Sequence, residues 1–164
     1  MRMQLLGMTC CLLWTASAMA QPAPEPDRIR LEQGLEELST QLKSLGEVSA
    51  VQRDDAELCA RAVRMILKHE EFFKPSYVKL ADQVLDLGRQ RVAALQSGQA
   101  VEHTQGRKAL AYRSRIDDSL QPYSVGLPPG YADAQGKRWP LHLVLHGRNG
   151  SLTEVSFIAG AEGK

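Results

Sequence analysis

The spacing of the apolar residues changes along the chain, and this change constrains the fold more than any other feature. Near the start, leucines recur at spacings of four and three, namely Leu31, Leu35, Leu38, Leu42 and Leu45. This spacing predicts one apolar face of a helix. From Ala109 onward apolar residues recur at a spacing close to two, which predicts β-strands. The sequence therefore favours a helical first part followed by a part that contains strands.

Three amphipathic helices are expected in the first part. The leucine helix is expected to end at Gly46, because glycine commonly follows a helix. A second helix is expected to begin near Asp54 and to stop before Pro75, since proline disfavours helix at the preceding residue. Ser76 is expected to cap a third helix, which ends near Gly98. The short connections predict an up-and-down helical bundle.

The first twenty residues have the pattern of a secretory signal peptide. A basic start is followed by an apolar run over residues 5–14 and by the small-residue ending Ala18-Met19-Ala20. This pattern predicts cleavage after Ala20 and a secreted or periplasmic protein. The run is too short to span roughly 30 Å of hydrocarbon as a helix, and an uncleaved anchor is the alternative interpretation. After cleavage no membrane partner is expected. The proline-rich residues 21–27 are expected to form a stiff linker.

Charge and cysteine content exclude several classes of protein. The 20 Lys and Arg nearly balance the 19 Asp and Glu, which argues against a nucleic-acid partner. Beyond the predicted cleavage site only Cys59 remains, on a helical face with Val63 and Ile66, which predicts a buried and inert thiol without a disulfide. His69 begins a sequence like the zinc motif H-E-x-x-H, but Phe73 occupies the second ligand position. No metal or other cofactor is expected.

An antiparallel hairpin is expected at the start of the second part. Its strands are predicted over residues 109–116 and 120–127, with turn-forming residues at 117–119. An exposed loop is expected over residues 128–136. The apolar run over residues 139–146 follows, and its centre is apolar on both faces. Such a run is typical of a central strand covered by helices on each side.

Small and polar residues connect that expected strand to another expected helix. The sequence from Ser151 to Glu154 has the form of a capping box, which predicts that the helix begins there. Backbone N–H groups in such a turn face the edge of the sheet, where they could stabilise the oxyanion of an acyl-transfer reaction. Gly147 and Gly150 fit an ordinary strand-to-helix turn equally well. The spacing alone leaves both interpretations open.

Five segments together match the pattern of a known family. They are residues 71–75 (EFFKP), 112–117 (YRSRID), 119–123 (SLQPY), 127–131 (LPPGY) and 145–150 (LHGRNG). With these segments the chain resembles secreted bacterial prolyl-oligopeptidase-family serine hydrolases, over residues 55–158. The resemblance implies a mixed α/β fold. Residues 28–98 would form a three-helix leader, and residues 109–164 the first strands and oxyanion loop of an incomplete α/β-hydrolase sheet.

The resemblance also implies an activity and a site. The family would hydrolyse an ester or a peptide bond through an acyl-serine. His146, Gly147 and Arg148 would form the oxyanion loop, with the backbone N–H of Arg148 as a donor. The nucleophile of such enzymes lies in Gly-x-Ser-x-Gly, and no Gly-x-Ser occurs in the 164 residues. We therefore expect the amino-terminal part of a hydrolase, without the Ser/Asp/His triad and inactive by itself.

A second interpretation is a small exported helical binding module without catalysis. The leucine stripe from Leu31 to Leu45 could pair with a partner helix instead of packing within the chain. About two heptads are short for a lasting coiled coil, and internal packing is the commoner outcome. The two hypotheses differ in whether the leucines are buried by this chain or left for a partner.

Overall fold

The computed structural model describes residues 19–99, 103, 105–134, 136–145, 147 and 149–162. Within them lie four helices and a two-stranded antiparallel sheet. In chain order the elements are α1 (Glu25–Lys43), α2 (Ala50–His69), α3 (Ser76–Gln96), β1 (Gly106–Arg113), β2 (Leu120–Leu127) and α4 (Glu154–Ala161). The expected mixture of helices and strands is confirmed at this coarse level. Residues 1–18 of the predicted signal peptide lie outside the described residues.

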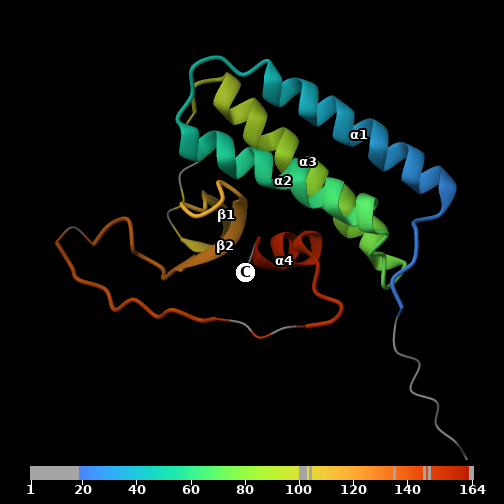
Figure 1. Ribbon diagram of the computed structural model, residues 1–164. Helices are drawn as coiled ribbons and strands as arrows, with labels where there is room; N and C mark the ends of the chain where they lie inside the picture. The colour runs from blue at the N-terminus through green and yellow to red at the C-terminus, as the bar shows by residue number, and fades with distance from the viewer. Residues whose placement is uncertain are drawn as a thin grey trace, which may run out of the picture.

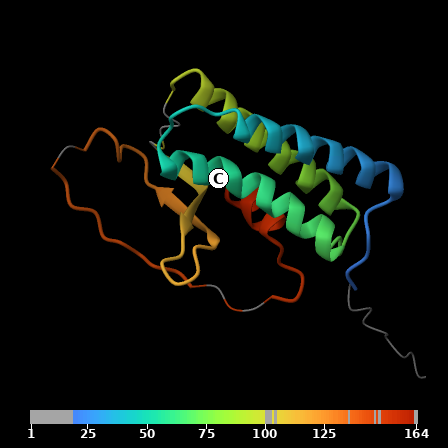
Figure 2. The same ribbon diagram turned by 45° about the horizontal axis from the view of Figure 1, so that its top comes forward.

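The helices α1, α2 and α3 form a bundle, and the hairpin and α4 pack against one side of it (Figure 1 and Figure 2). Each of these three helices contacts the other two. Both α2 and α3 also contact the second layer, whereas α1 contacts only α2 and α3 among the described elements. The helices α2 and α3 therefore pack against α1 on one side, and against the hairpin and α4 on the other.

The leucine stripe of α1 forms the centre of the bundle, as predicted. Three of its leucines, Leu31, Leu38 and Leu42, are buried, and Leu35 packs against them in a half-buried position. Leu45 is buried as well but lies beyond α1, which ends at Lys43 and not at the expected Gly46. The helices approach closely at Gly88 of α3, where an added Cβ would lie 2.6 Å from the Leu38 side chain and 2.9 Å from the Cβ of Cys59. The stripe is thus buried by the chain itself.

The helix α1 begins earlier than the sequence suggested. It starts at Glu25, inside the proline-rich residues 21–27 that were expected to form a linker. Pro24 is the N-cap and Pro26 lies in the first turn, where proline is tolerated because its missing N–H would have no helical partner. Ala23 is buried in the core. The linker expectation is therefore wrong for the end of this segment.

The ends of α2 and α3 are determined by local features of the backbone and the sequence. The helix α2 begins at Ala50 with Ser49 as N-cap, not near Asp54, and Asp54 lies within the helix facing the hairpin. It ends at His69, because Glu70 adopts a left-handed conformation (φ 53°) before Pro75 is reached. The helix α3 spans Ser76–Gln96, followed by Gly98 with φ +71°. Its predicted bounds are confirmed, but its N-cap is Pro75 and not the expected Ser76.

The predicted hairpin is confirmed, but β1 begins and ends three residues earlier than expected, so that residues 114–116 belong to the turn. The strands β1 and β2 pair in antiparallel register from Gly106 opposite Leu127 to Arg113 opposite Leu120. The Asp117 carboxylate accepts hydrogen bonds from the backbone N–H and the hydroxyl of Ser119, which stabilise the turn. The turn-forming residues identified in the sequence therefore lie in the turn, as predicted.

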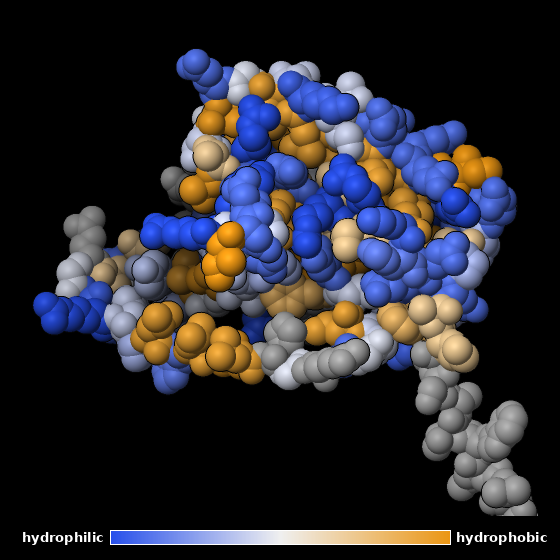
Figure 3. All heavy atoms as spheres, viewed as in Figure 1, coloured by the Kyte–Doolittle hydropathy of each residue, from blue (hydrophilic) through white to orange (hydrophobic). Residues whose placement is uncertain are grey.

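The apolar run over residues 139–146 departs most from expectation. Its described residues, 139–145, form no strand, and four of them are largely exposed: Leu141 (92%), Leu143 (78%), Val144 (84%) and Leu145 (84%). Figure 3 shows hydrophobic side chains gathered along this outer connection between β2 and α4. A strand requires a neighbour for its N–H and C=O groups, and β1 and β2 pair only with each other. The central-strand prediction is therefore wrong for this structure.

Candidate functional site

The predicted oxyanion loop leads into the N-terminus of α4. Of its three predicted residues, His146 and Arg148 lie outside the described residues, whereas Gly147 is described and exposed. Just beyond them, the Asn149 side-chain oxygen accepts hydrogen bonds from the Ser151 backbone N–H at 3.0 Å and from its hydroxyl at 3.2 Å. Asn149 thus closes the turn before α4, a role that its small, polar side chain suits.

The helix α4 is capped by Thr153 and not by Ser151. The Thr153 hydroxyl oxygen accepts from the Ser156 backbone N–H at 3.1 Å, and the Thr153 N–H donates to the Ser156 hydroxyl at 3.0 Å. This reciprocal pair is a capping box, two residues later than the one predicted from Ser151 to Glu154. Glu154 is the first residue of α4 and not its third, and its carboxylate pairs with Arg61 of α2.

The start of α4 is attached to the helical bundle by two polar contacts. The hydroxyl of Tyr77, in the first turn of α3, donates to the Ser151 carbonyl at 2.6 Å. The Arg61–Glu154 ion pair is three-quarters buried, and burial raises the pKa of the Glu154 carboxyl. Val155 and Ile158 add fully buried apolar contacts. The loop that precedes α4 therefore ends at a fixed position on the bundle.

The end of α4 is attached through Arg91 of α3. The Arg91 side chain is 4% exposed, and its guanidinium donates to the Asp55 carbonyl (2.6 Å), the Ala109 carbonyl (2.6 Å) and the Glu162 carboxylate (2.8 Å). The same carboxylate accepts from the Ala109 N–H at 2.9 Å. One arginine therefore joins α2, α3, β1 and the end of α4.

Carboxylates also occupy the edge of β1 that faces away from β2. The N–H of Ala109 donates to Glu162, and the N–H of Ala111 donates to the Asp55 carboxylate at 2.7 Å. Arg113, at the end of the strand, pairs with Asp54 at 2.8 Å. An unpaired strand edge is prone to pairing with other chains. Here carboxylates from α2 and from the end of α4 accept hydrogen bonds from two N–H groups of this edge.

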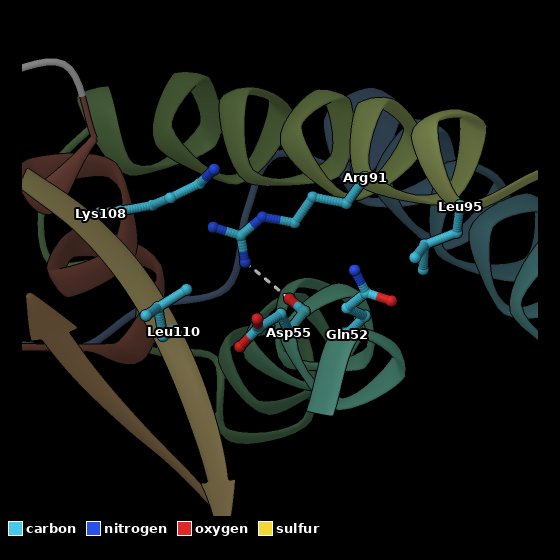
Figure 4. Close-up of a pocket in the computed structure, with 6 residues that line it drawn as sticks. All are labelled: Gln52, Asp55, Arg91, Leu95, Lys108 and Leu110. Carbon is cyan, nitrogen blue, oxygen red and sulfur yellow. Dashed lines mark hydrogen bonds between the residues drawn. The ribbon is translucent and has the colours of Figure 1, made fainter. Parts of the chain in front are cut away.

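A small cavity lies beside Arg91, between α2, α3 and β1 (Figure 4). Its volume is about 20 Å³, and it is lined by Gln52, Asp55, Arg91, Leu95, Lys108 and Leu110. This volume holds about one water molecule and excludes an organic substrate. Burial raises the pKa of Asp55 and lowers the pKa of Lys108. The cluster therefore supports the fold and does not form a substrate pocket.

Cys59 is buried next to this cluster. The Arg91 guanidinium lies 3.9 Å from its Sγ. Burial raises the pKa of the thiol to about 11, which keeps it protonated and unreactive at neutral pH. The prediction of a buried thiol is confirmed.

Sequence reasoning missed the residues that hold α4 in place. Arg91 lies one turn from both Gly88 and Leu95, on the buried face of α3. A charged residue on an apolar face is the sequence feature that could have indicated a buried ion pair. Tyr77 and Arg61 carry no comparable feature, because their partners lie in a loop and a helix that are distant in sequence.

The structure places no metal site or membrane span among the residues it describes. No three His, Cys, Asp or Glu side chains of the described ranges are grouped as metal ligands. No described helix combines the length and apolar character that a membrane span requires. Comparison with protein-family models, curated proteins and solved structures gave no match for this chain.

Proposed function

We propose that these residues are the amino-terminal part of an exported serine hydrolase, similar to the prolyl-oligopeptidase family. The complete enzyme would hydrolyse an ester or peptide bond. The observation that carries the proposal is the attachment of the loop before α4 to the bundle, through Tyr77 and the Ser151 carbonyl. Oxyanion stabilisation requires N–H donors that are held in place before the reaction begins.

The turn around Asn149 supplies the local part of this arrangement. Its side chain closes the turn onto Ser151, and the Thr153–Ser156 box fixes the first turn of α4. In the complete enzyme the backbone N–H of Arg148 would donate to the oxyanion, while a serine attacks the carbonyl carbon and a histidine takes its proton. The helical leader would position the loop without touching the substrate.

The exposed apolar residues of the preceding segment support the same proposal. Leu141, Leu143 and Leu145 are each at least 78% exposed. Full burial of one such side chain stabilises by roughly 1.5–3 kcal/mol. We propose that this segment becomes a strand when further strands of the complete enzyme pair with it.

A binding module built on the leucine stripe has less support. The three buried leucines of α1 and the buried Leu45 that follows it belong to the core of the bundle, and none of them is exposed to a partner helix.

The proposal predicts that the 164 residues alone neither turn over p-nitrophenyl esters nor react with a fluorophosphonate probe. The sequence contains no Gly-x-Ser, so no nucleophile elbow can form within it. A serine hydrolase of known activity, tested in parallel, verifies the probe and the ester. Labelling of any serine among these residues, together with ester turnover, would overturn the proposal.

A further inference from the structure

Gln21, which follows the predicted cleavage site, is hydrogen-bonded to the rest of the protein. The backbone carbonyl of Gln21 accepts a hydrogen bond from the Phe72 N–H at 3.2 Å. Ala23 is 7% exposed and belongs to the core, whereas Met19 is 82% exposed. Cleavage after Ala20 would therefore leave Gln21 as a first residue that is already attached to the bundle.

We propose that Gln21 of the exported protein cyclises to pyroglutamate and caps the mature chain. This inference rests on the proposed export and cleavage. The α-amine nitrogen attacks the side-chain carboxamide carbon, a new C–N bond closes a lactam ring, and the former amide nitrogen leaves as ammonia. No oxidant or cofactor is consumed. The positively charged amine is replaced by a neutral lactam.

The surroundings of Gln21 are compatible with this product. Gln21 is exposed, so its side chain has room to turn back onto the amine. Its carbonyl takes no part in the reaction, and the hydrogen bond from Phe72 is therefore retained. Gln21 also lines a groove of about 320 Å³ with Pro22, Pro24, Phe72, Pro75 and Val78. A lactam ring is close to proline in shape and fits among these apolar neighbours.

Basic and acidic side chains both line the groove. Lys74 and Lys79 line it, together with Asp27 and Asp82. Both of these aspartates pair with Arg30. A free ammonium at Gln21 would add a further positive charge near the two lysines, and cyclisation removes it.

The sequence indicates what the cap protects against. Gln21-Pro22, Ala23-Pro24 and Glu25-Pro26 are three successive X-Pro dipeptides. Exopeptidases that remove X-Pro dipeptides require a free amine at the chain end. Two successive cuts here would remove Gln21 with its hydrogen bond to Phe72, the buried Ala23, and Pro24, which is the N-cap of α1. A lactam has no free amine, so the first cut is blocked.

The test is mass spectrometry of the exported protein, produced from the full chain in a bacterium with a secretion pathway. We expect an N-terminal peptide that begins at position 21 and is lighter than the uncyclised peptide by one ammonia. The matched control, Gln21→Ala, should begin at the same position with a free amine. Treatment with an X-Pro dipeptidyl peptidase should shorten the control and leave the wild type intact.

The outcomes separate the two proposals. A wild-type chain that begins at position 21 but keeps a free amine after prolonged incubation overturns cyclisation while leaving export standing. A chain that retains residues 1–20, or begins at another residue, contradicts the proposed export and removes the basis of the modification. A cyclised wild type that is shortened as fast as the control overturns the protective role.

Discussion

Arg91 and Glu162 form a salt bridge of 2.8 Å that joins the middle of the helical bundle to the end of α4. The arginine is almost fully buried, and the Glu162 side chain is 27% exposed. Because the Ala109 N–H donates to the same carboxylate, the pair also holds β1 in place. The second layer of the protein is thus attached to the bundle by a shared charged contact as well as by apolar packing.

Replacing Arg91 should destabilise the protein strongly. Arg91→Met leaves the Glu162 carboxylate and the Asp55 and Ala109 carbonyls without their donor. Breaking one partner of a buried ion pair costs about 3–5 kcal/mol. Urea unfolding followed by circular dichroism measures this loss.

The control for this substitution lies on the same helix. Arg89 pairs with Glu37 and Asp86 in an exposed position. Arg89→Met should cost at most about 1 kcal/mol, as is usual for exposed pairs. Equal losses for the two variants would contradict the role assigned to Arg91.

The cap of α4 can be assigned by a pair of alanine substitutions. Thr153→Ala should cost about 0.5–2 kcal/mol, because it removes the acceptor for the Ser156 N–H. Ser151→Ala should have a much smaller effect, since its hydroxyl makes only a 3.2 Å bond to Asn149 and its carbonyl still accepts from Tyr77. Hydrogen exchange of the α4 amides reports the difference. Faster exchange in Ser151→Ala than in Thr153→Ala would show that the cap is misassigned.

Asp55 should make the stability depend on pH in a defined direction. Burial raises the pKa of its carboxyl above the ordinary value of 3.8. Between 3.8 and the raised value the folded state binds more protons than the unfolded state, so the free energy of unfolding falls as the pH rises. Asp55→Asn keeps an oxygen for the Ala111 N–H and removes this dependence. The free energy of unfolding of the wild type, relative to that of Asp55→Asn, should therefore fall as the pH rises. Urea unfolding at several pH values measures it.

Asp117 provides a control of opposite sign. The hydrogen bond from the Ser119 hydroxyl lowers the pKa of Asp117 below 3.8. Its contribution to stability is present above 3.8 and is lost as the pH falls through the lowered value. The wild type should thus gain stability relative to Asp117→Asn as the pH rises over this window. The same sign for both carboxyls would refute the environments described here.

The exposed apolar segment should make the isolated 164-residue chain self-associate. Leu143 and Leu145 are 78% and 84% exposed, and a large exposed apolar patch favours association. A double variant, Leu143→Ser with Leu145→Ser, should associate less in sedimentation velocity experiments while its urea midpoint stays unchanged. A wild-type chain that remains monomeric at high concentration would speak against this prediction.

Periodicity predicted the elements whose partners lie within the chain. The α1 leucines and the β1–β2 hairpin follow local patterns that the described residues satisfy by themselves. The run ending at Leu145 was misjudged, because an apolar composition indicates that burial is favourable but not which segment provides it. None of the described elements covers the run, which stays exposed.

The candidate site was predicted in part. The position of a turn followed by a helix was correct, but Ser151 and Thr153 both have the chemistry of an N-cap, and only packing selects between them. The attachment of the loop to Tyr77 and Arg61 depends on contacts between residues that are far apart in sequence. Such contacts leave no local pattern.

The most direct measurement is the coding sequence that follows the codon for Lys164, combined with probe labelling of the extended protein. The account predicts an in-frame Gly-x-Ser-x-Gly whose serine reacts with a fluorophosphonate, while the 164 residues alone do not react. A stop codon directly after Lys164, or an extended protein without a reactive serine, would contradict it.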